Sequence, residues 1–199
     1  MGRPADLGKR ADLLRRVREY VIGNGLADLS LRPLAKALGT SDRMLLYYFG
    51  SKDRLVAEAL AQDEGRPLVL LRQALDSAGP PGDAAGMRLV MEELWSQFTA
   101  PERREVLPVT FEVMTASVLN TSRYGPVMRN LLIEWRSLLA SAFAGLGMSE
   151  ERAAVEAGLL VDATLGLLHA SLADDDWGQA TAAFRVLLDR LEPAWQADA

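Results

Sequence analysis

The sequence predicts an all-α fold, and three observations support this prediction. The 199 residues include 34 leucines and 29 alanines but only 13 valines and 2 isoleucines. Small and straight-chain apolar residues favour helices, whereas β-branched residues favour strands. Apolar residues also recur three or four positions apart through most of the chain, which is the period of an amphipathic helix. Glycines, prolines and capping residues separate these stretches, so we expect about nine helices.

The N-terminal part begins with a helix over residues 7–24. It is expected to end in the Gly-Asn-Gly of residues 23–25, because these residues tolerate the left-handed backbone conformation that closes helices. A second helix is expected over residues 30–39. Ser30 stands where an N-cap is needed, and Pro33 lies in the first turn, where its missing N–H has no consequence.

A tight turn at residues 39–41 leads to a third, short helix over residues 42–49. A fourth helix opens at Ser51, which is placed as its N-cap. The Gly-Arg-Pro of residues 65–67 interrupts the helical period, so a kink or a break is expected there before the helix resumes and runs to about residue 78.

The second half of the chain starts with a loop at residues 76–83, where two prolines and two glycines exclude a regular element. The helical period then returns in five stretches. The expected helices cover residues 84–99, 101–119, 125–146, 150–173 and 177–195.

Composition limits the classes of function. With 49% hydrophobic and 25% charged residues and a mean hydropathy of +0.03, the chain resembles soluble globular proteins. No run of about 18 uncharged apolar residues and no apolar leader occur, so we expect a cytoplasmic protein without a membrane partner. The absence of cysteine and the single histidine, His169, leave little material for a metal centre or acid–base catalysis. No cofactor, no metal and no enzymatic activity are expected.

Charge is unevenly distributed along the chain. Residues 1–54 hold 11 basic and 6 acidic side chains, whereas the remainder holds 11 basic and 21 acidic ones. Salt screens charge beyond about 8–10 Å, so a basic segment attracts phosphates only locally. This split favours contact between the N-terminal part and a polyanion, although ordinary surface variation would also explain it.

The second and third helices, joined by a tight turn that contains Gly39, form the pattern of a helix-turn-helix. The residues after the turn resemble the TetR family of bacterial transcriptional regulators, whose module ends in a stretch like Leu-Tyr-x-His-Phe-x-x-Lys-x-x-Leu. The matching residues are Leu45, Tyr47, Phe49, Lys52 and Leu55. The resemblance covers about residues 8–62. It departs from the family at Leu46, where a tyrosine is usual, and at Tyr48, where a histidine is usual.

The resemblance implies a three-helix helix-turn-helix DNA-binding domain at residues 1–52 and a helical effector-binding and dimerisation domain at residues 53–199. It also implies a sequence-specific transcriptional regulator, namely a homodimeric repressor that a small-molecule effector releases from a palindromic operator. An activator, an enzyme with an appended helix-turn-helix and a helical interaction protein that never binds DNA are the alternatives.

Carried over to this sequence, the family's DNA contacts fall on residues between Ser30 and Lys52. Phosphate contacts are expected from Ser30, Tyr47, Tyr48 and Lys52, base contacts from Ser41, Asp42, Arg43 and Met44, and further contacts from Arg32 and Thr40. Arg43 is the strongest candidate for specificity, because a guanidinium pairs with both acceptors of guanine. Asp42 would repel phosphate unless it accepts from a cytosine amino group or caps the helix. Arg3 is a candidate for the minor groove, or part of a disordered terminus.

Large side chains on the middle helices are suited to lining an apolar effector pocket, although each taken alone also fits core packing. The candidates are Trp95, Phe98, Phe111, Met114, Val118 and Trp135. Glu112, Glu134 and Asp162 interrupt apolar helix faces. They are interpreted either as surface carboxylates or as a weak indication of a cationic ligand.

The last two expected helices carry apolar and small residues at helical spacing. Such a stripe belongs either to the monomer core or to a dimer interface, and the family resemblance favours the interface. The candidates are Leu159, Ala163, Gly166, Ala170, Phe184, Leu188 and Leu191. A dimer would hold two recognition helices roughly 34–36 Å apart, which is one turn of DNA.

Overall fold

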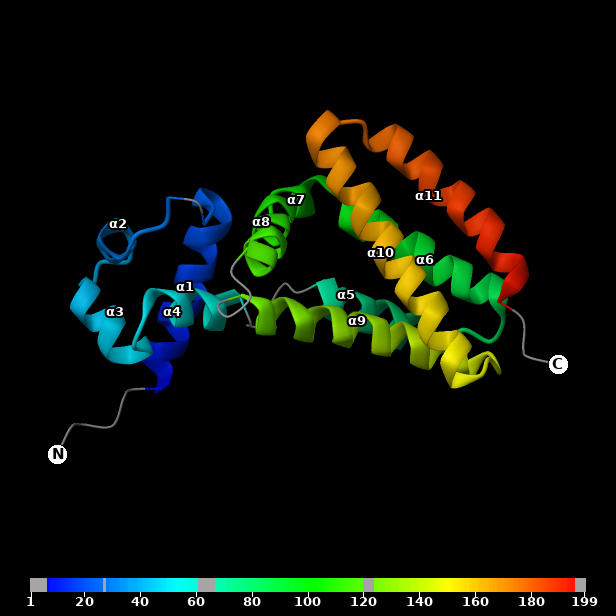
Figure 1. Cartoon of the computed structure of the whole chain (residues 1–199), viewed down its shortest axis with the longest axis horizontal. Helices are drawn as coiled ribbons and strands as arrows, with labels where there is room; N and C mark the ends of the chain where they lie inside the picture. The colour runs from blue at the N-terminus through cyan, green and yellow to red at the C-terminus, as the bar shows by residue number, and fades with distance from the viewer. Residues whose placement is uncertain (1–6, 27, 61–66, 120–123, 196–199) are drawn as a thin grey trace. The chain divides into compact units, whose positions relative to one another are not determined.

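The computed structural model describes residues 7–26, 28–60, 67–119 and 124–195, and all regular elements in these ranges are helices, as the sequence predicts (Figure 1). Two features expected from the sequence lie wholly or partly outside them, namely the arm with Arg3 and the interruption at residues 65–67. The helices are α1 (Leu7–Asn24), α2 (Leu31–Ala37), α3 (Asp42–Phe49), α4 (Lys52–Leu60), α5 (Pro67–Ala78), α6 (Ala84–Thr99), α7 (Pro101–Arg104), α8 (Leu107–Leu119), α9 (Gly125–Gly145), α10 (Glu150–Asp174), α11 (Trp177–Leu191) and the 3-10 turn η1 (Glu192–Ala194).

The chain forms two compact units, here called unit 1 and unit 2. Unit 1 contains α1–α4 together with residues 108–129, that is, nearly all of α8 and the beginning of α9. Unit 2 contains α5, α6, α7, the remainder of α9, α10, α11 and η1. Helix α8 thus belongs with the N-terminal helices, although it follows α7 in the sequence.

The structure has more elements than the nine expected because three predicted stretches are each described as two elements: 51–78 as α4 and α5, 101–119 as α7 and α8, and 177–195 as α11 and η1. Proline accounts for the last two divisions. The helix expected over residues 101–119 is divided into α7 and α8. Proline inside a helix lacks the N–H for the backbone bond and clashes with the preceding turn, so Pro108 fits only in the first turn of a new helix. The last expected helix ends at Leu191, and the Pro193 segment continues as η1.

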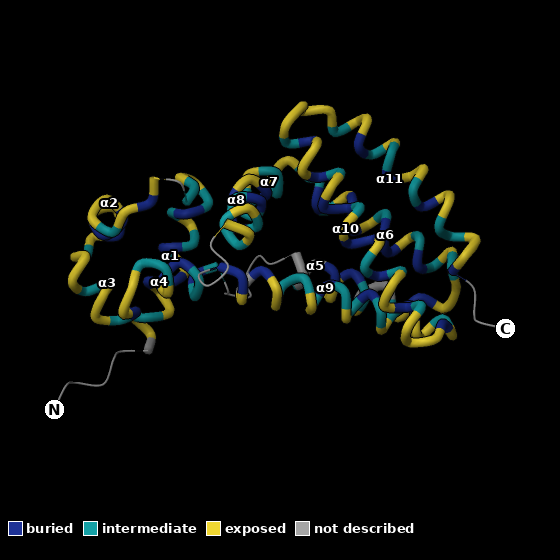
Figure 2. The backbone as a smooth tube through the Cα atoms, in the orientation of Figure 1, coloured by how far each residue is buried: buried dark blue, intermediate teal, exposed yellow. Residues whose placement is uncertain are grey.

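Contacts within unit 1 hold one face of the short helix α3 against its neighbouring helices. Leu45 and Phe49 of α3 are buried, and α3 packs against α2 and α4 (Figure 2). The Arg10 guanidinium of α1 lies 5.1 Å from the centre of the Phe49 ring and forms an ion pair with Glu58 of α4. The Arg16 side chain donates to the Leu38 carbonyl oxygen at 2.8 Å. These contacts hold α3 with its opposite face outward.

A carboxylate of α8 contacts the residues that follow α1. The Glu112 Oε2 atom accepts a hydrogen bond from the Leu26 backbone N–H at 2.7 Å. Gly25 closes α1 with a φ of 74°, and a Cβ at this position would lie 3.1 Å from the same oxygen. The left-handed backbone and the close approach of α8 both favour glycine here.

Unit 2 is held together by ring stacking and by an ion network at its surface. The Trp95 ring of α6 stacks on the Phe184 ring of α11, with centroids 4.5 Å apart. Arg88 of α6 forms ion pairs with Asp189 at 2.8 Å and Glu192 at 2.9 Å, and also contacts Glu92. Hydrogen bonds from the guanidinium to Glu192 and Asp189 raise the pKa of Arg88 above its ordinary value, so this side chain stays charged while it joins α6 to the C-terminal helices.

Helix α10 is the one described helix that is long and apolar enough to cross a membrane by length and composition. A third (33%) of its most apolar window is buried within the chain. Core helices of soluble proteins meet the same criterion, so the finding does not by itself indicate a membrane. The large apolar side chains that α10 exposes are Val155 and Leu159.

Candidate DNA-binding surface and ligand pocket

The turn between α2 and α3 has the geometry that a helix-turn-helix needs. Gly39 adopts a φ of 63°, and the Thr40 N–H donates back to the Ala35 carbonyl oxygen at 2.9 Å, which closes α2. Ser41 is the N-cap of α3, and its hydroxyl oxygen accepts from the Met44 N–H at 3.2 Å. The turn therefore stops α2 and starts α3 within a few residues.

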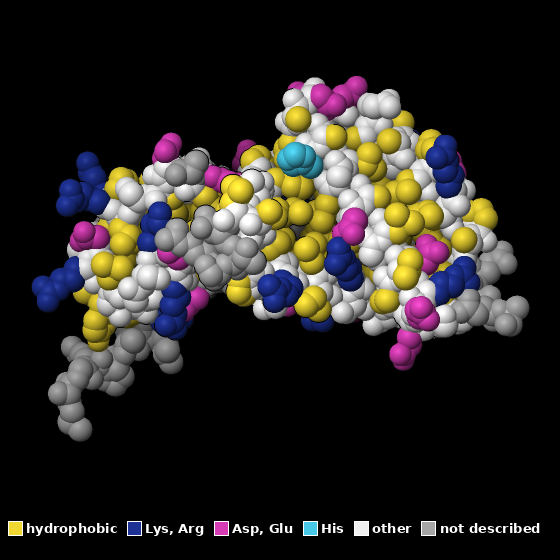
Figure 3. Space-filling model, in the orientation of Figure 1, with side chains coloured by type: hydrophobic (Ala, Val, Ile, Leu, Met, Phe, Trp, Pro, Cys, Tyr) yellow, Lys and Arg dark blue, Asp and Glu magenta, His cyan; other side chains and the backbone are white. Residues whose placement is uncertain are grey.

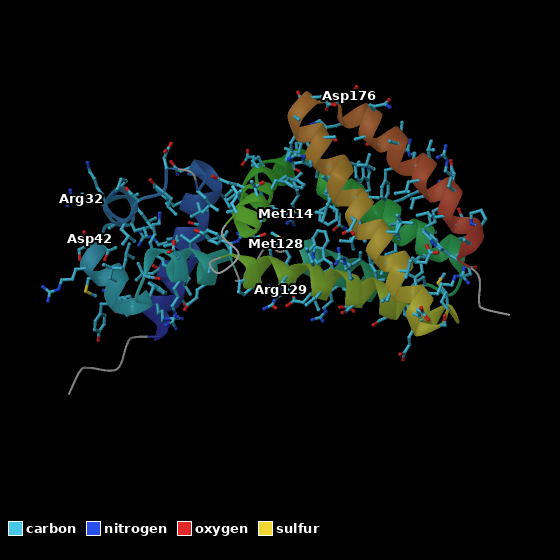
Figure 4. All side chains as sticks on the ribbon, viewed as in Figure 1. Arg32, Asp42, Met114, Met128, Arg129 and Asp176 are labelled. Atoms are coloured by element: carbon cyan, nitrogen blue, oxygen red, sulfur yellow. The ribbon has the colours of Figure 1, made fainter. Side chains whose placement is uncertain are left out.

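The outer face of α3 is open to solvent. Tyr47 is 60% exposed, Arg43 is exposed as well, and the Tyr47 and Tyr48 rings meet edge to face with centroids 5.4 Å apart. Arg32 projects from α2 and Asp42 stands at the start of α3 (Figure 4). The space-filling view shows basic side chains projecting from this part of unit 1 (Figure 3).

All ten residues expected to contact DNA lie between the start of α2 and the first turn of α4, and none is buried. Exposed are Ser30, Arg32, Ser41, Asp42, Arg43 and Tyr47, and half-buried are Thr40, Met44, Tyr48 and Lys52. The Asp42 carboxylate accepts from the Arg43 backbone N–H at 2.9 Å, which matches the capping interpretation. Ser30 occupies the N-cap position of α2 but makes no side-chain cap bond, so its hydroxyl is not committed to that helix.

Lys52 has a structural role that the sequence does not reveal. Its Nζ atom donates to the Leu29 carbonyl oxygen at 2.7 Å, which joins the first turn of α4 to the segment before α2. Ser51 caps α4 by accepting from the Arg54 N–H at 3.1 Å, as expected. The Lys52 ammonium group keeps two further donors, so a phosphate contact would be added to this internal bond and would not replace it.

Unit 2 contains an apolar pocket with about 370 Å³ of space, its opening to solvent included. Three of the six expected pocket residues, Trp95, Phe98 and Trp135, line it together with Phe184, Thr164 and aliphatic side chains of α5, α6, α9 and α10. The Phe98 and Trp135 rings stack with centroids 5.6 Å apart. The other three candidates, listed last, lie on α8 in unit 1 and do not line this pocket: Phe111, Met114 and Val118.

The acidic residues interpreted as a sign of a cationic ligand do not line the pocket. Glu112 is bound to the end of α1, and Asp162 forms an exposed ion pair with Arg136 at 2.7 Å. No charged side chain lines the pocket, and no group of three or more His, Asp or Glu residues suited to a metal ion occurs in the described part of the chain. The alternative interpretation, solvated surface carboxylates, therefore fits Asp162.

The expected dimer residues divide into two groups. Leu159, Gly166 and Ala170 are exposed on α10, and Ala163 and Leu191 are half-buried. Phe184 and Leu188 are only 1% and 0% exposed because α11 turns them into the core of its own unit, so these two expectations are corrected. Val155 and Val186, which the sequence analysis does not single out, are 66% and 46% exposed on the same two helices. Hydrophobic side chains are spread over this face of α10 and α11 (Figure 3).

Comparison with known solved structures supports the fold over nearly the whole chain. A transcriptional regulator from Rhodococcus sp. Rha1 superposes with a TM-score of 0.73 at 20% identity, covering 92% of this chain and 96% of its own. A TetR-family regulator from Mesorhizobium loti gives 0.74 at 13% identity and 97% of each chain. A regulator from Saccharomonospora viridis, in complex with choline, gives 0.69 at 21% identity, covering 94% and 96%. At these identities the likeness shows the fold.

The N-terminal module also matches a known family in sequence. No curated protein matches the chain significantly. Residues 13–59, from α1 through α4, match the family model described as bacterial regulatory proteins, tetR family. This range contains the turn, the recognition helix α3 and the matching residues from Leu45 to Leu55. Residues 13–59 thus match the tetR-family DNA-binding module, and the whole chain has the fold of these solved transcriptional regulators.

Proposed function

We propose that the chain is a homodimeric repressor that binds a palindromic DNA operator and leaves it when a small molecule occupies unit 2. In this proposal residues 1–52 bind DNA, and residues 53–199 bind the effector and form the dimer. The observation that carries the proposal is the outer face of α3, where Arg43 and Tyr47 face solvent while Leu45 and Phe49 anchor the helix from the other side. A helix held in this way can enter a major groove without losing its own packing.

The exposed residues of this surface divide into candidates for base contacts and candidates for phosphate contacts. Arg43 lies in the first turn of α3, the end of a recognition helix that reads base edges, and its guanidinium can pair with guanine. The Ser30 hydroxyl, Arg32 and Tyr47 are also exposed on this module and would position the helix by contacting phosphates. Arg43 would then determine which sequence is preferred, and the others would determine how tightly any DNA is held.

The uncovered face of α10 supports the homodimer. Only a third of its most apolar window is buried, and Val155 and Leu159 follow one another at a spacing of four on the exposed side. The small residues Gly166 and Ala170 would allow a second helix to approach closely. A second copy of the same face would cover this surface with a two-fold symmetric interface.

The pocket of unit 2 supports the effector. Its aromatic and aliphatic lining is typical of a small-molecule site. The similar protein from Saccharomonospora viridis was crystallised with choline, which supports small-molecule binding in this fold without identifying the molecule for this chain. The effector would lower DNA affinity by binding more tightly to the DNA-incompetent arrangement, since equal affinity for both arrangements shifts nothing.

Selection of bound sequences from a random DNA pool, repeated over a series of salt concentrations, tests this proposal. We expect a palindrome to be enriched and its affinity to fall steeply with salt, as phosphate neutralisation requires. Enrichment of a single half-site without symmetry would contradict the dimer. Binding that is weak and insensitive to salt would favour the helical interaction protein instead. Transcription from the selected site with and without the protein separates a repressor from an activator.

A further inference from the structure

Trp135, which lines the pocket, differs from the other three tryptophans of the chain in the hydrogen bonding of its indole N–H. The indole N–H of Trp95 donates to Thr181, that of Trp177 to Asp175 and that of Trp195 to Glu156, at 3.0, 2.9 and 3.3 Å respectively. The indole N–H of Trp135, which lines the pocket, has no acceptor among the described residues. Trp135 is only 6% exposed, so bulk water does not replace that acceptor.

Thr164 differs in the same way from two other helical threonines, Thr99 and Thr181. The hydroxyls of Thr99 and Thr181 donate to the carbonyl oxygen four residues earlier, at 2.8 and 2.7 Å. Thr164, on α10, is 5% exposed and lines the same pocket, yet its hydroxyl has no partner in the described ranges. The pocket therefore combines an apolar wall with two unused polar groups.

Polar groups without a hydrogen-bond partner are energetically unfavourable in the buried lining of a pocket. A buried donor without an acceptor costs about 1–3 kcal/mol, and most buried polar side-chain atoms in folded proteins are paired. A ligand that supplies the missing partner recovers this free energy on binding. The pairing also gives specificity, because an isosteric ligand without the oxygen leaves the donor unpaired.

We propose that the pocket binds a small, uncharged, mainly apolar molecule with a carbonyl or hydroxyl oxygen, which accepts from the Trp135 indole N–H and pairs with the Thr164 hydroxyl. This inference rests on the proposed effector site of unit 2 and adds its ligand class. The lining contains no charged side chain, so a carboxylate or an ammonium group would lose its hydration without gaining a counter-charge. The aromatic pairs Trp95–Phe184 and Phe98–Trp135 supply the apolar surface.

Four probes that share one phenyl ring test the ligand class with the purified full-length protein. Acetophenone carries the carbonyl, ethylbenzene lacks it, benzoate carries a negative charge and phenyltrimethylammonium a positive one. Calorimetric titration should give acetophenone an affinity at least about tenfold higher than that of each other probe, which corresponds to one buried hydrogen bond. The Trp135 indole proton should move downfield in the NMR spectrum with acetophenone and stay in place with ethylbenzene.

Substitutions assign the two polar groups. Trp135→Phe and Thr164→Val keep most of the side-chain volume, and each should reduce the preference for acetophenone over ethylbenzene from about tenfold to about threefold or less. Trp135→Phe also identifies the indole signal. The matched controls Trp177→Phe and Thr115→Val alter residues that do not line the pocket and should leave the preference unchanged.

Equal affinities for acetophenone and ethylbenzene, a preference for either charged probe, or no binding of any probe would overturn the ligand class. So would an unchanged Trp135 signal in the presence of bound acetophenone. DNA selection with the same preparation distinguishes these results from failure of the regulator itself. A protein that enriches a palindrome but shows no acetophenone preference keeps the proposed function and loses only this inference.

Discussion

Arg43 is the single side chain on which sequence discrimination should depend most. It is exposed in the first turn of α3, and its backbone N–H is already held by Asp42, so the guanidinium extends from a fixed point. Arg43→Ala should weaken binding to the selected operator by about 1–3 kcal/mol and change binding to random DNA much less. Fluorescence anisotropy on both DNAs at one salt concentration measures this difference. The control is Arg72→Ala on α5, and equal losses on both DNAs would remove Arg43 as a base reader.

Lys52 should affect both stability and DNA binding, because its ammonium group holds the Leu29 carbonyl oxygen at 2.7 Å. Lys52→Ala should lower the free energy of unfolding by about 1–2 kcal/mol, since the half-buried carbonyl loses a charged donor. It should also weaken binding to every DNA sequence and make the salt dependence shallower. Urea unfolding and anisotropy measure the two effects. The exposed Lys36→Ala serves as the control for stability, and a Lys52→Ala protein as stable as the parent would contradict the internal bond.

The structural roles of Lys52 and Phe184 were not predicted because they depend on partners that are distant in the chain. Nothing near Lys52 in the sequence indicates a bond to Leu29, which lies 23 positions away. Phe184 was expected at the dimer face because it fits an apolar stripe, and only its stacking on Trp95 shows that it belongs to the core. Helical periodicity identifies which residues avoid water, but it does not distinguish a neighbouring helix of the same chain from one of a second chain.

At the scale of helices, boundaries set by local signals were predicted well. Helices α1, α3 and α6 have the expected bounds, because glycine, Ser41 and Asp83 end or cap them within the sequence itself. The expected helix over residues 101–119 was wrong at its centre. Its apolar residues continue through the region of Pro108, so periodicity favoured one helix where proline geometry requires two.

The contact between α1 and α8 gives a prediction at the same scale. Gly25→Ala places a Cβ on a backbone with a φ of 74° and 3.1 Å from the Glu112 carboxylate, so it should destabilise the protein by about 1–2 kcal/mol. Chemical unfolding measures the change. The matched control is Gly23→Ala, which lies inside α1 with nothing within 4 Å of its Cβ and should stabilise the helix slightly.

Combining Gly25→Ala with Glu112→Ala separates two contributions to the loss of stability: the strained backbone of residue 25 and the close approach to the Glu112 carboxylate. Glu112→Ala alone leaves the Leu26 N–H without its acceptor and should itself be destabilising. If the close approach matters, Gly25→Ala should cost less in the Glu112→Ala background than in the parent, because the opposing carboxylate is gone. An equal cost in both backgrounds would assign the whole effect to the backbone conformation of Gly25.

For the whole molecule, two helix-turn-helix modules are useful only if one interface keeps them at a fixed separation. Binding of one half-site by a single module is weak, and joining two modules makes the second contact intramolecular. In the proposed dimer, the exposed apolar residues of α10 would therefore affect how tightly the helix-turn-helix of unit 1 is held on DNA. Dimer stability and operator affinity should then fall together.

Leu159→Glu tests this connection, because it places a charge at the centre of the exposed apolar face while leaving the core of unit 2 intact. Sedimentation should show a monomer at concentrations where the parent is a dimer, and operator affinity should fall by at least about tenfold, towards that of an isolated half-site. Leu89→Glu, a substitution of another exposed leucine (66%) on α6, should change neither quantity. If the Leu159→Glu protein is still a dimer, then the interface lies elsewhere. If it is a monomer with full operator affinity, then operator affinity does not depend on a dimer that keeps two modules at a fixed separation.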